Sequence, residues 1–406
     1  MSNFKLVMMG LGYIGLPTAA VVASRGINVL GVDVNESVVN TINEGKIHIV
    51  EPELDNLVKD VVEKGLLQAS LTPEEAEVYL IAVPTPFKNN NKPDLKYVES
   101  ATRMILPKLK EGDLYIIEST CPVGTTQKMA NIIFDERPEL KDKINIAYCP
   151  ERVLPGKVIF ELENNDRVIG GINESSTFLA MNFYKKFVKG KLHSTNAKTA
   201  EMCKLVENSS RDVSIAFANE LSIICDKADV NVWELINLAN KHPRVNILQP
   251  GTGVGGHCIA VDPWFIVSDF EKEAKIIRNA REINNYKTNW VIEKIKSTAL
   301  QFELNTGKKP VVALMGMAFK ANIDDLRESP ALQVAETLLS KDFCDLVFVE
   351  PNILRHDEYI LTKLSQLDKV DIVAYLVAHK EFIDFKTSAL ELDFCGVKKN
   401  NFEKFI

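Results

Sequence analysis

Three glycines near the N-terminus constrain the fold of this chain more than any other feature. The segment Gly10 to Gly15 reads G-x-G-x-x-G and follows the β-rich run Phe4 to Met9. A helix is expected from Leu16 to Ser24, and a second strand beginning at Gly26 ends at Asp33, 18 residues after the last glycine. A strand, a glycine turn, a helix and a second strand ending in an acid are, in this order, typical of a dinucleotide-binding fold.

The residue types in this segment match what a bound dinucleotide needs. Gly10 would form the tight turn, Gly12 would let the pyrophosphate approach the backbone, and Gly15 would let the helix pack closely on the strand. Free N–H groups at the helix N-terminus would bind the phosphates. Asp33 would accept hydrogen bonds from the adenosine ribose and repel a 2′-phosphate, which favours NAD over NADP. The residues expected to hold NAD here are Gly10, Gly12, Tyr13, Ile14, Gly15 and Asp33.

The same segment allows two other interpretations. The stretch from Leu6 to Ser24 carries no charge and follows Lys5, as a secretory signal would. The apolar core of a signal does not usually contain three spaced glycines and a proline, whereas a strand, tight turn and helix account for each of them. A glycine turn without a ligand is the second alternative, and the acid that ends the second strand argues against it.

The composition indicates a folded chain of two or three domains and excludes several classes of protein. Of the 406 residues, 46% are hydrophobic and 25% are charged, which supplies enough apolar material for large cores. Lysine and arginine total 48 against 55 acidic residues, and the net charge of -7 argues against binding nucleic acid through bulk charge. We expect no nucleic-acid partner, no membrane partner and no metal.

The seven cysteines are scattered and include no C-x-x-C pair. This spacing argues against a disulfide scaffold and against a zinc site. It indicates a reducing compartment, so we expect a cytoplasmic protein.

Three further β-like runs alternate with helical stretches such as Asp94 to Leu109, which predicts a parallel sheet covered by helices. The runs are Val78 to Val83, Leu114 to Glu118 and Ile144 to Tyr148. Because ligands of open α/β sheets bind beyond the carboxyl ends of the strands, the turns that follow are candidate site positions, although they also fit ordinary turns. The turns are Pro84-Thr85-Pro86, Ser119-Thr120-Cys121-Pro122 and Cys149-Pro150-Glu151.

The middle of the chain should be helical. Residues Lys191 to His242 include no glycine or proline, and one long helix is expected from about Thr199 to Ala228. Its apolar residues fall on more than one face, which favours burial between domains or subunits. A second helical stretch should run from Trp264 to Thr306.

After Gly307 the α/β pattern starts again and predicts a second, smaller α/β domain. The expected fold class is therefore α/β, with two Rossmann-like parallel-sheet domains joined by a central helical region. The expected domains are residues 1–198, 199–306 and 307–406. The elements expected in the last domain are strands at Val311 to Met315, Leu346 to Val349 and Asp371 to Val377, and a helix from about Ser329 to Ser340.

The segment from Pro250 to Pro263 is the densest candidate for chemistry. It holds four glycines within six residues, followed by His257, Cys258 and Asp262. Glycines let the backbone approach a ligand closely. A packing role suits the other six cysteines, but Cys258 alone follows such a glycine loop and is the candidate nucleophile. His257 could act as a base or only contact ligand or backbone, and its role stays open.

This segment resembles the active-site segment of the UDP-glucose/GDP-mannose dehydrogenase family, whose members use two NAD molecules to oxidise the C6 alcohol of a nucleotide sugar to a carboxylate. The resemblance covers essentially the whole chain, because several motifs occur in the order of the family. They are Gly10 to Gly15 with Pro17, Pro84-Thr85-Pro86, Ser119-Thr120 with Gly124-Thr125-Thr126, Pro150-Glu151, Lys204 with Asn208, Gly255 to Asp262, and Gly316 to Lys320 with Arg327 to Ser329.

The resemblance implies a covalent mechanism that keeps the aldehyde intermediate bound. Cys258 would add to the aldehyde as a thiohemiacetal, the second hydride would leave a thioester, and water would release the uronate. Lys204 and Asn208, one helical turn apart, would stabilise the alkoxide and the tetrahedral oxyanions, although alone they would also suit a solvated helix pair. The positions implied for holding or deprotonating the water are Asp262, Glu151 and Thr120.

The resemblance also implies roles outside this centre. Lys320 matches a lysine directed toward the sugar nucleotide, Arg327 matches an arginine near the cofactor, and Arg244 matches one that reaches the substrate of a neighbouring subunit. We therefore expect a homodimer built on the central helix. Ordinary surface charge is the alternative for Lys320 and Arg327. The other residues assigned by the resemblance are Thr85 for the cofactor, and Glu151, Arg152, Lys204, Asn208, Arg211, Gly255 and His257 for the substrate.

Two departures from the family pattern bear on the substrate. In the UDP-glucose branch a second glutamate follows the Pro-Glu motif by four residues, whereas Pro155 stands there in this chain. The run from Gly255 to Phe265 resembles the branch that acts on UDP-N-acetylhexosamines. The resemblance favours UDP-N-acetyl-D-mannosamine, oxidised for surface polysaccharide biosynthesis, with its C2 epimer UDP-N-acetylglucosamine as the alternative. Less favoured are UDP-glucose, a non-catalytic nucleotide-sugar sensor, and a two-electron hydroxyacid dehydrogenase, which would not explain Cys258.

Overall fold

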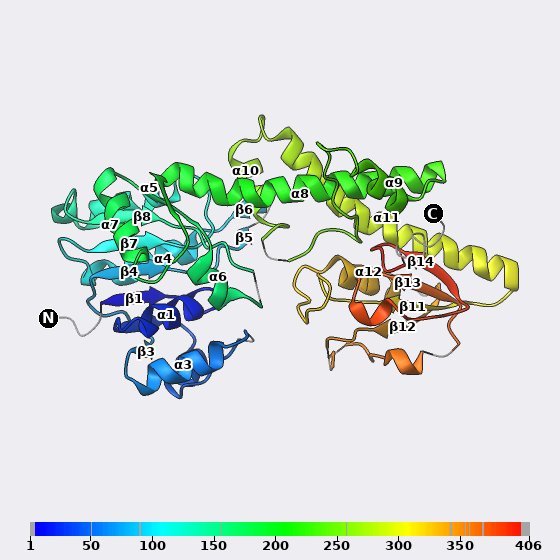
Figure 1. Ribbon diagram of the computed structural model, residues 1–406, viewed down its shortest axis with the longest axis horizontal. Helices are drawn as coiled ribbons and strands as arrows, with labels where there is room; N and C mark the ends of the chain where they lie inside the picture. The colour runs from blue at the N-terminus through cyan, green and yellow to red at the C-terminus, as the bar shows by residue number, and fades with distance from the viewer. Residues whose placement is uncertain are drawn as a thin grey trace. The chain divides into compact units, whose positions relative to one another are not determined.

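The computed structural model describes residues 5–49, 51–88, 91–154, 156–256, 258–341, 343–353, 355–356, 358–367 and 369–398. The chain forms two compact units, Met1–Val206 and Glu207–Ile406. Each unit is built around its own sheet of mainly parallel strands (Figure 1). The expected α/β class with two separate parallel sheets is confirmed.

An eight-stranded sheet forms the core of the first unit, in the order β10-β9-β8-β7-β4-β1-β2-β3. The strand β1 pairs in parallel with β2 on one side and with β4 on the other. Because the strand order reverses beside β1, the carboxyl end of β1 is the point where such sheets bind ligands. The strands are β1 (Leu6–Met9), β2 (Val29–Val32), β3 (Leu67–Ser70), β4 (Val78–Ile81), β7 (Leu114–Ile117), β8 (Asn145–Tyr148), β9 (Arg167–Gly171) and β10 (Leu192–Asn196), with a small ribbon of β5 (Phe87–Lys88) and β6 (Lys92–Pro93).

Helices cover both faces of this sheet. In β1, Leu6 and Met8 belong to one hydrophobic core, and Val7 and Met9 belong to the other, as the alternation of strand side chains requires. Residues of α1, α3, α6 and α7 fill the first core, and residues of α4 and α5 fill the second. The helices are α1 (Gly15–Ser24), α2 (Glu36–Asn43), α3 (Leu54–Glu63), α4 (Lys96–Ile105), α5 (Thr125–Glu136), α6 (Val158–Asn164), α7 (Glu174–Tyr184) and the 3-10 helices η2 (Leu106–Lys108) and η3 (Pro138–Leu140).

Two features of this sheet differ from the prediction. The strand β9 runs antiparallel to β8 and pairs in parallel with β10, whereas a wholly parallel sheet was expected. The strand β10 also lies inside the stretch that was expected to be helical because it lacks glycine and proline. This edge strand is polar and largely exposed. It therefore has no apolar periodicity, and the absence of glycine and proline does not distinguish a strand from a helix.

The second unit contains a four-stranded parallel sheet in the order β12-β11-β13-β14. Residues of α11 and α12 cover one face, among them Ile295 and Val334, and the segment around Phe382 covers the other. The strand predicted from Val311 to Met315 is found with those bounds. The elements are β11 (Val311–Met315), β12 (Asp345–Val349), β13 (Ile372–Tyr375), β14 (Leu390–Asp393), α12 (Pro330–Leu339), η4 (Leu364–Gln366) and η5 (Lys380–Phe382).

Two long helices lie between the sheets in the sequence. The helix α8 (Ala197–Ala228) confirms the predicted long helix, and α9 (Val232–Ala239) follows it. The helical stretch predicted from Trp264 is divided into α10 (Asp262–Asp269) and α11 (Lys275–Thr306). Gly307, with φ of 67°, ends α11 in the left-handed conformation that glycine favours. Across the described parts of the chain, no helix combines the length and apolar character needed to cross a lipid bilayer.

Candidate functional site

The glycines of the turn after β1 differ in the space that surrounds them. A Cβ atom on Gly10 would lie 2.5 Å from the carbonyl oxygen of Ala82, and one on Gly15 would lie 1.9 Å from the carbonyl oxygen of Gly10. Both positions therefore exclude a side chain. A Cβ atom on Gly12 would meet no atom within 4 Å, so this glycine faces open space just before α1. A phosphate can approach the backbone there.

Asp33 follows β2 and holds the glycine turn through its carboxylate. Oδ2 accepts the N–H of Leu11 at 3.0 Å, and Oδ1 accepts the N–H of Asn35 at 2.9 Å. The side chain is only half-buried, and each carboxylate oxygen can accept a further hydrogen bond. Tyr13 is 46% exposed beside this turn, and Ile14 is the N-cap of α1. The open face of Gly12 and the oriented carboxylate fit the pyrophosphate and the adenosine ribose of NAD.

Hydroxyl groups tie the turn after β4 to the turn after β7. Ser119 Oγ donates to the carbonyl oxygen of Val83 at 2.7 Å and accepts the N–H of Val83 at 2.9 Å. Thr85 Oγ1 donates to the carbonyl oxygen of Thr120 at 2.7 Å. The structure thus brings the expected residues Thr85 and Thr120 together. The hydroxyl proton of Thr85 is used in the hydrogen bond between the two turns.

Glu201, which the sequence did not single out, caps the helix that follows the second turn. Its Oε1 accepts the N–H and the hydroxyl of Thr126 at 2.7 and 2.6 Å, and its Oε2 accepts the N–H of Gly124 at 2.6 Å. Gly124, with φ of 93°, stands at the N-cap of α5 and has no side chain to satisfy the first N–H groups. Burial raises the pKa of Glu201, and the hydrogen bonds from Thr126 and Gly124 oppose this change.

A buried ionic cluster lies at the carboxyl ends of β7 and β8. The carboxylate cluster comprises Glu118, Glu151, Arg167 and Tyr184, each at most 7% exposed. Arg167 Nη1 donates to Glu151 Oε2 at 2.7 Å, and Tyr184 Oη donates to Glu118 Oε1 at 2.6 Å. Glu151 Oε1 accepts the N–H of Arg152 at 2.6 Å. Glu151, expected to handle water, is therefore a buried group with both oxygens already in hydrogen bonds.

One carboxyl group of this cluster keeps its proton up to neutral pH. Burial raises the pKa of Glu118 to about 7, with Glu151 adding to the rise and Arg167 opposing it. Among the described residues Glu118 Oε2 has no hydrogen-bond partner, so no donor stabilises a negative charge on this oxygen. With Glu118 neutral, the charges of Glu151 and Arg167 balance. Burial also raises the pKa of the adjacent Cys149 to about 12, which excludes a reactive thiolate there.

In the second unit, other segments of the protein pack closely against the glycine segment, residues 250–263. A Cβ atom on Gly255 would lie 2.4 Å from the carbonyl oxygen of Glu328, and one on Gly253 would lie 2.4 Å from Thr288 Oγ1. Gly256 has φ of 81°, and its Cβ would lie 2.9 Å from the ring of Phe319. These glycines were expected to make room for a ligand. Neighbouring protein segments already require the absence of a side chain at all three positions, so these glycines have a packing role, and the ligand contact stays a prediction.

Cys258 stands at the end of the glycine segment and is exposed. Its carbonyl oxygen accepts the N–H groups of Val261 and Asp262 at 3.1 and 2.9 Å, so a single turn joins it to α10. Asp262 is only 3% exposed, and its Oδ2 accepts a hydrogen bond from Asn208 Nδ2 at 2.5 Å. The structure therefore brings the expected residues Asn208, Cys258 and Asp262 into one region.

Buried amides connect the start of the glycine segment to α8 and α11. Asn219 Oδ1 accepts the N–H of Gly251 at 2.9 Å, and Asn219 Nδ2 donates to Asn284 Oδ1 at 2.9 Å. Asn284 Nδ2 donates in turn to Asp212 Oδ1 at 2.7 Å, which also accepts Arg281 Nη1 at 2.7 Å. Such a connected polar network, fully buried at its three central members, fixes the segment against both helices.

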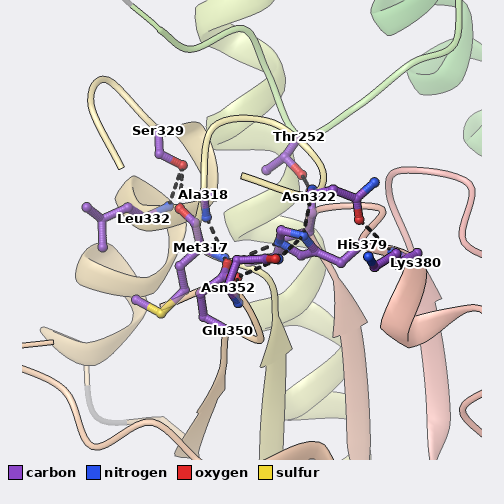
Figure 2. A network of polar contacts seen from close by, with 11 residues as sticks. Thr252, Met317, Ala318, Asn322, Ser329, Leu332, Glu350, Asn352, His379 and Lys380 are labelled. Carbon is purple, nitrogen blue, oxygen red and sulfur yellow. Dashed lines mark hydrogen bonds and ion pairs between the residues drawn. The ribbon is translucent and has the colours of Figure 1, made fainter. Parts of the chain in front are cut away.

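A second network fixes the loop after β11 (Figure 2). Glu350, at the end of β12, accepts the N–H groups of Met317 and Ala318 at 2.7 and 3.1 Å through Oε2. The same oxygen lies 3.1 Å from Nε2 of the fully buried His379. Burial alone would raise the pKa of Glu350, but the hydrogen bonds from His379, Met317 and Asn352 outweigh it and lower the pKa.

His379 extends this network to the segment that follows Lys320. Its Nδ1 accepts the N–H of Asn322 at 2.9 Å, so the ring proton lies on Nε2 and is donated to Glu350. Lys320 itself is exposed. Arg327 is exposed as well, and its Nη2 donates to Asp325 Oδ2 at 2.6 Å within the same loop. The loop is therefore rigidly supported, while its lysine faces solvent.

The remaining expected substrate residues lie near the surface. Lys204 is half-buried, one turn before Asn208 on α8, and Arg211 on the same helix is exposed. Arg244 is exposed in the loop after α9, and Arg152 is half-buried. In the part of the chain that the structure describes, no group of three or more potential ligand side chains could hold a metal ion. The sequence predictions that fall outside the described residues concern Phe4, Pro155 and His257.

Exposure distinguishes Cys258 from the other cysteines. Of the seven cysteines, Cys258 alone is exposed. Burial raises the pKa of Cys225, as it does that of Cys149. The buried or half-buried cysteines are Cys121, Cys149, Cys203, Cys225, Cys344 and Cys395.

Sequence reasoning missed the carboxylates and cations that support the loops. Glu118 and Glu350 each follow an apolar strand directly, and a charge at that position is a signal that could have identified both. Glu201 lies within a helical pattern and Arg167 precedes the apolar part of β9, so neither position carries a local signal. Their roles depend on partners far away in the sequence.

Three family models match the chain, and all belong to the UDP-glucose/GDP-mannose dehydrogenase family. The NAD binding domain matches residues 4–188, the central domain matches residues 198–286, and the UDP binding domain matches residues 313–397. Together the matches extend over most of the chain.

Individual relatives are similar over nearly the full length. A UDP-N-acetyl-D-mannosamine dehydrogenase from Campylobacter jejuni is 55% identical over 408 residues, covering 96% of this chain and 99% of the relative. An NDP-N-acetyl-D-galactosaminuronic acid dehydrogenase from Ralstonia nicotianae is 52% identical over 404 residues, covering 96% and 94%. The solved structure of the UDP-N-acetyl-mannosamine dehydrogenase Cap5O from Staphylococcus aureus has a TM-score of 0.87 at 37% identity, covering 98% of this chain and 99% of that chain.

The glycine turn predicts opposite effects for two alanine substitutions. Gly15→Ala should lower the free energy of unfolding by about 3 kcal/mol or more, because its Cβ would overlap the backbone of Gly10. Gly12→Ala should leave stability nearly unchanged and weaken NAD binding about tenfold or more, because its Cβ enters the space left for the pyrophosphate. Urea unfolding and calorimetric titration with NAD measure the two effects. Equal stability of both variants, or undiminished NAD binding by Gly12→Ala, would contradict this assignment.

The carboxylate cluster predicts a specific pH dependence of stability. Because the pKa of Glu118 is raised in the folded state, its contribution is fully present below the unfolded pKa of about 4.5 and is lost as the pH rises through about 7. Glu118→Gln should remove this loss, on the order of 3 kcal/mol, and become more stable relative to wild type between pH 5 and 8. Urea unfolding at several pH values tests this. Glu111 is exposed, so the free energy of unfolding of Glu111→Gln should change with pH as that of wild type does. A difference in stability between Glu118→Gln and wild type that is independent of pH would refute the assignment.

Proposed function

The chain belongs to the UDP-glucose/GDP-mannose dehydrogenase family and is an NAD-dependent UDP-sugar dehydrogenase, and from this we propose that it oxidises UDP-N-acetyl-D-mannosamine to UDP-N-acetyl-D-mannosaminuronate. The reaction converts the C6 alcohol to a carboxylate and removes four electrons. Relatives that carry the name UDP-N-acetyl-D-mannosamine dehydrogenase support the substrate. The exposed Cys258, next to the Asn208–Asp262 hydrogen bond, is the observation that carries the chemistry.

NAD would be held by the glycine turn of the first unit. Gly12 leaves room for the pyrophosphate, the N-terminus of α1 attracts it, and Asp33 is oriented to accept the ribose hydroxyls. NAD supplies a hydride acceptor, and one molecule is consumed in each of the two oxidation steps. Thr85, Thr120 and Arg327 are the further residues that we assign to cofactor binding.

The first oxidation requires the alcohol to lose a hydride and a proton. Lys204 supplies a positive charge to the developing alkoxide, and Asn208, on the next turn of α8, supplies the amide N–H that does not bind Asp262. The resulting aldehyde is electrophilic at C6. The residues assigned to substrate binding, besides Lys204 and Asn208, are Glu151, Arg152, Arg211, Arg244, Gly255, His257 and Lys320.

Cys258 would retain the aldehyde until the second oxidation. Its sulfur adds to C6 and the carbonyl oxygen takes a proton, giving a thiohemiacetal; loss of hydride and of the hydroxyl proton then gives a thioester. Water attacks the thioester carbonyl and the thiol leaves, which releases the carboxylate. The sum is one alcohol, one water and two NAD⁺ converted to one carboxylate, two NADH and three protons. Asp262, Glu151 and Thr120 are assigned to the water step.

Two other substrates remain in competition. UDP-N-acetylglucosamine differs from the proposed substrate only at C2, and the relative from Ralstonia nicotianae carries the name of an NDP-N-acetyl-D-galactosaminuronic acid dehydrogenase. A non-catalytic nucleotide-sugar sensor would not need an exposed Cys258 beside a buried Asp262, so we disfavour it.

The proposal extends to the organisation of the protein. Residues 1–198 would bind NAD, residues 199–306 would carry the catalytic cysteine, and residues 307–406 would bind the UDP-sugar. We also infer that the protein works in the cytoplasm, in line with the scattered spacing of its cysteines, and that its product serves surface polysaccharide biosynthesis.

The reaction predicts two NADH per sugar consumed. NADH is followed at 340 nm with UDP-N-acetyl-D-mannosamine, UDP-N-acetylglucosamine, UDP-N-acetylgalactosamine and UDP-glucose, and the first should show the highest kcat/KM. Cys258→Ser should lose more than about 10³-fold in kcat because no thioester can form. Cys203→Ser, at a half-buried cysteine, is the matched control and should keep its activity. One NADH per sugar with free aldehyde as product would refute the mechanism, and equal rates would refute the substrate assignment.

A homodimer is proposed from apolar residues that α8 and α9 leave exposed. Phe217 and Ile224, seven residues apart on α8, are 50% and 54% exposed, and Leu238 on α9 is 56% exposed. Phe217→Asp should convert the dimer to a monomer in sedimentation at micromolar concentration, because a buried unpaired carboxylate is costly. Leu304→Asp, at an 80% exposed leucine of α11, is the control that should remain dimeric. A wild-type monomer with full activity would contradict the proposal.

A further inference from the structure

A cavity of about 440 Å³ lies in the second unit, apart from the residues assigned above to catalysis or binding. Residues of α8, the start of α9, α11 and the end of β14 line it. Its volume is in the range of small-molecule sites. Two of the three tryptophans of the chain, Trp233 and Trp290, belong to its wall together with Phe394. The cavity therefore offers flat apolar surfaces of the kind that bind planar rings.

A buried lysine belongs to the same wall. Lys287 on α11 is 1% exposed, and its Nζ lies 3.9 Å from the centroid of the Trp290 ring. Nζ donates to Ser222 Oγ at 2.7 Å, and the hydroxyl of Ser222 donates to the carbonyl oxygen of Asn219 at 2.6 Å. No carboxylate of the described residues lies within ion-pair distance of Lys287. An ammonium group in this position is desolvated without a counter-charge, which is unfavourable.

The charged groups around Lys287 are already engaged with one another. Asp226 of α8 binds Lys294 of α11 at 2.7 Å. Glu391 at β14 accepts the hydroxyl of Tyr375 at 2.7 Å and lies 3.6 Å from the Lys398 ammonium. The carboxylate of Asp393 accepts N–H groups of the turn that follows it, which are those of Cys395, Gly396, Val397 and Lys398. Lys287 is thus the cation of the cavity that lacks an anionic partner.

We propose that this cavity binds a small organic anion, whose acidic group pairs with the Lys287 ammonium and whose planar apolar body lies against Trp233 and Trp290. The acidic group supplies the missing counter-charge, and the indole rings bury the apolar body. No residue of the catalytic assignment lines this cavity, so a failure of the binding test would leave the proposed function unaffected, and the reverse also holds.

Binding should be coupled to proton uptake. Burial lowers the pKa of Lys287 to about 7, and Asp226 opposes this change only in part. At pH 8 most of the free protein therefore carries a neutral amine. An anion that pairs with the ammonium raises the pKa of Lys287, so the protein takes up a proton when the anion binds.

Benzoate and its neutral analogue benzamide are the probes that test the proposal. Tryptophan fluorescence and calorimetry on the full-length protein should show at least about tenfold tighter binding of benzoate, and calorimetry at pH 8 in buffers of different ionisation enthalpy should show proton uptake. Lys287→Met should lose the preference for benzoate and still bind benzamide. Lys294→Met removes a lysine of the same helix that Asp226 already neutralises, and it should keep the preference.

Three outcomes would overturn the proposal. One is equal binding of benzoate and benzamide to the wild type, and another is an unchanged benzoate affinity in Lys287→Met. The third is no binding of either probe at millimolar concentration, as expected if a second copy or another part of the chain fills the cavity. Benzoate binding to the wild type without proton uptake at pH 8 would overturn it as well, so the test remains decisive even if Lys287→Met does not fold.

Discussion

Carboxylates that accept backbone N–H groups hold the loops on which both units depend. A loop has N–H groups that no strand or helix satisfies, and a carboxylate can accept several of them in charge-assisted hydrogen bonds. Asp33 binds the glycine turn in this way, Glu201 binds the start of α5, and Glu350 binds the loop after β11. Glu51 does the same for Gly156 and Val158, each at 2.8 Å. Hydrogen bonds from backbone N–H groups to carboxylates therefore support both the loops assigned to the cofactor and the loop assigned to the sugar nucleotide.

Local patterns were sufficient for the elements whose signal lies within a short window. The glycine turn, the long helix α8 and the strand β11 were predicted almost residue by residue, because periodicity or punctuation marks each of them. Asn208, Cys258 and Asp262 were named from motifs, and the structure brings them together. The division between α10 and α11 was not predicted, since neither glycine nor proline marks it and Phe270 ends the first helix.

Features that depend on distant partners could not be read from the sequence. The antiparallel pairing of β9 with β8 places Arg167 beside Glu151, although no local pattern links the two residues. The three packed glycines around Gly255 look the same in the sequence as Gly12, which faces open space. Only the neighbours, such as Thr288 and the carbonyl oxygen of Glu328, distinguish a glycine required by packing from one available to a ligand.

The use of charge explains how an acidic protein can bind anionic ligands. Many buried carboxylates are neutralised locally, either by backbone N–H groups, as for Glu201 and Glu350, or by a guanidinium, as for Glu151 and Asp212. The net charge of -7 therefore describes the whole chain and does not give the potential that a ligand meets near these loops. Buried arginines form ion pairs with these carboxylates, so anion binding depends on helix N-termini and on cations that have no carboxylate partner. Lys287 meets this criterion in the interior of the second unit, which is why its cavity is the place where a second anion should bind.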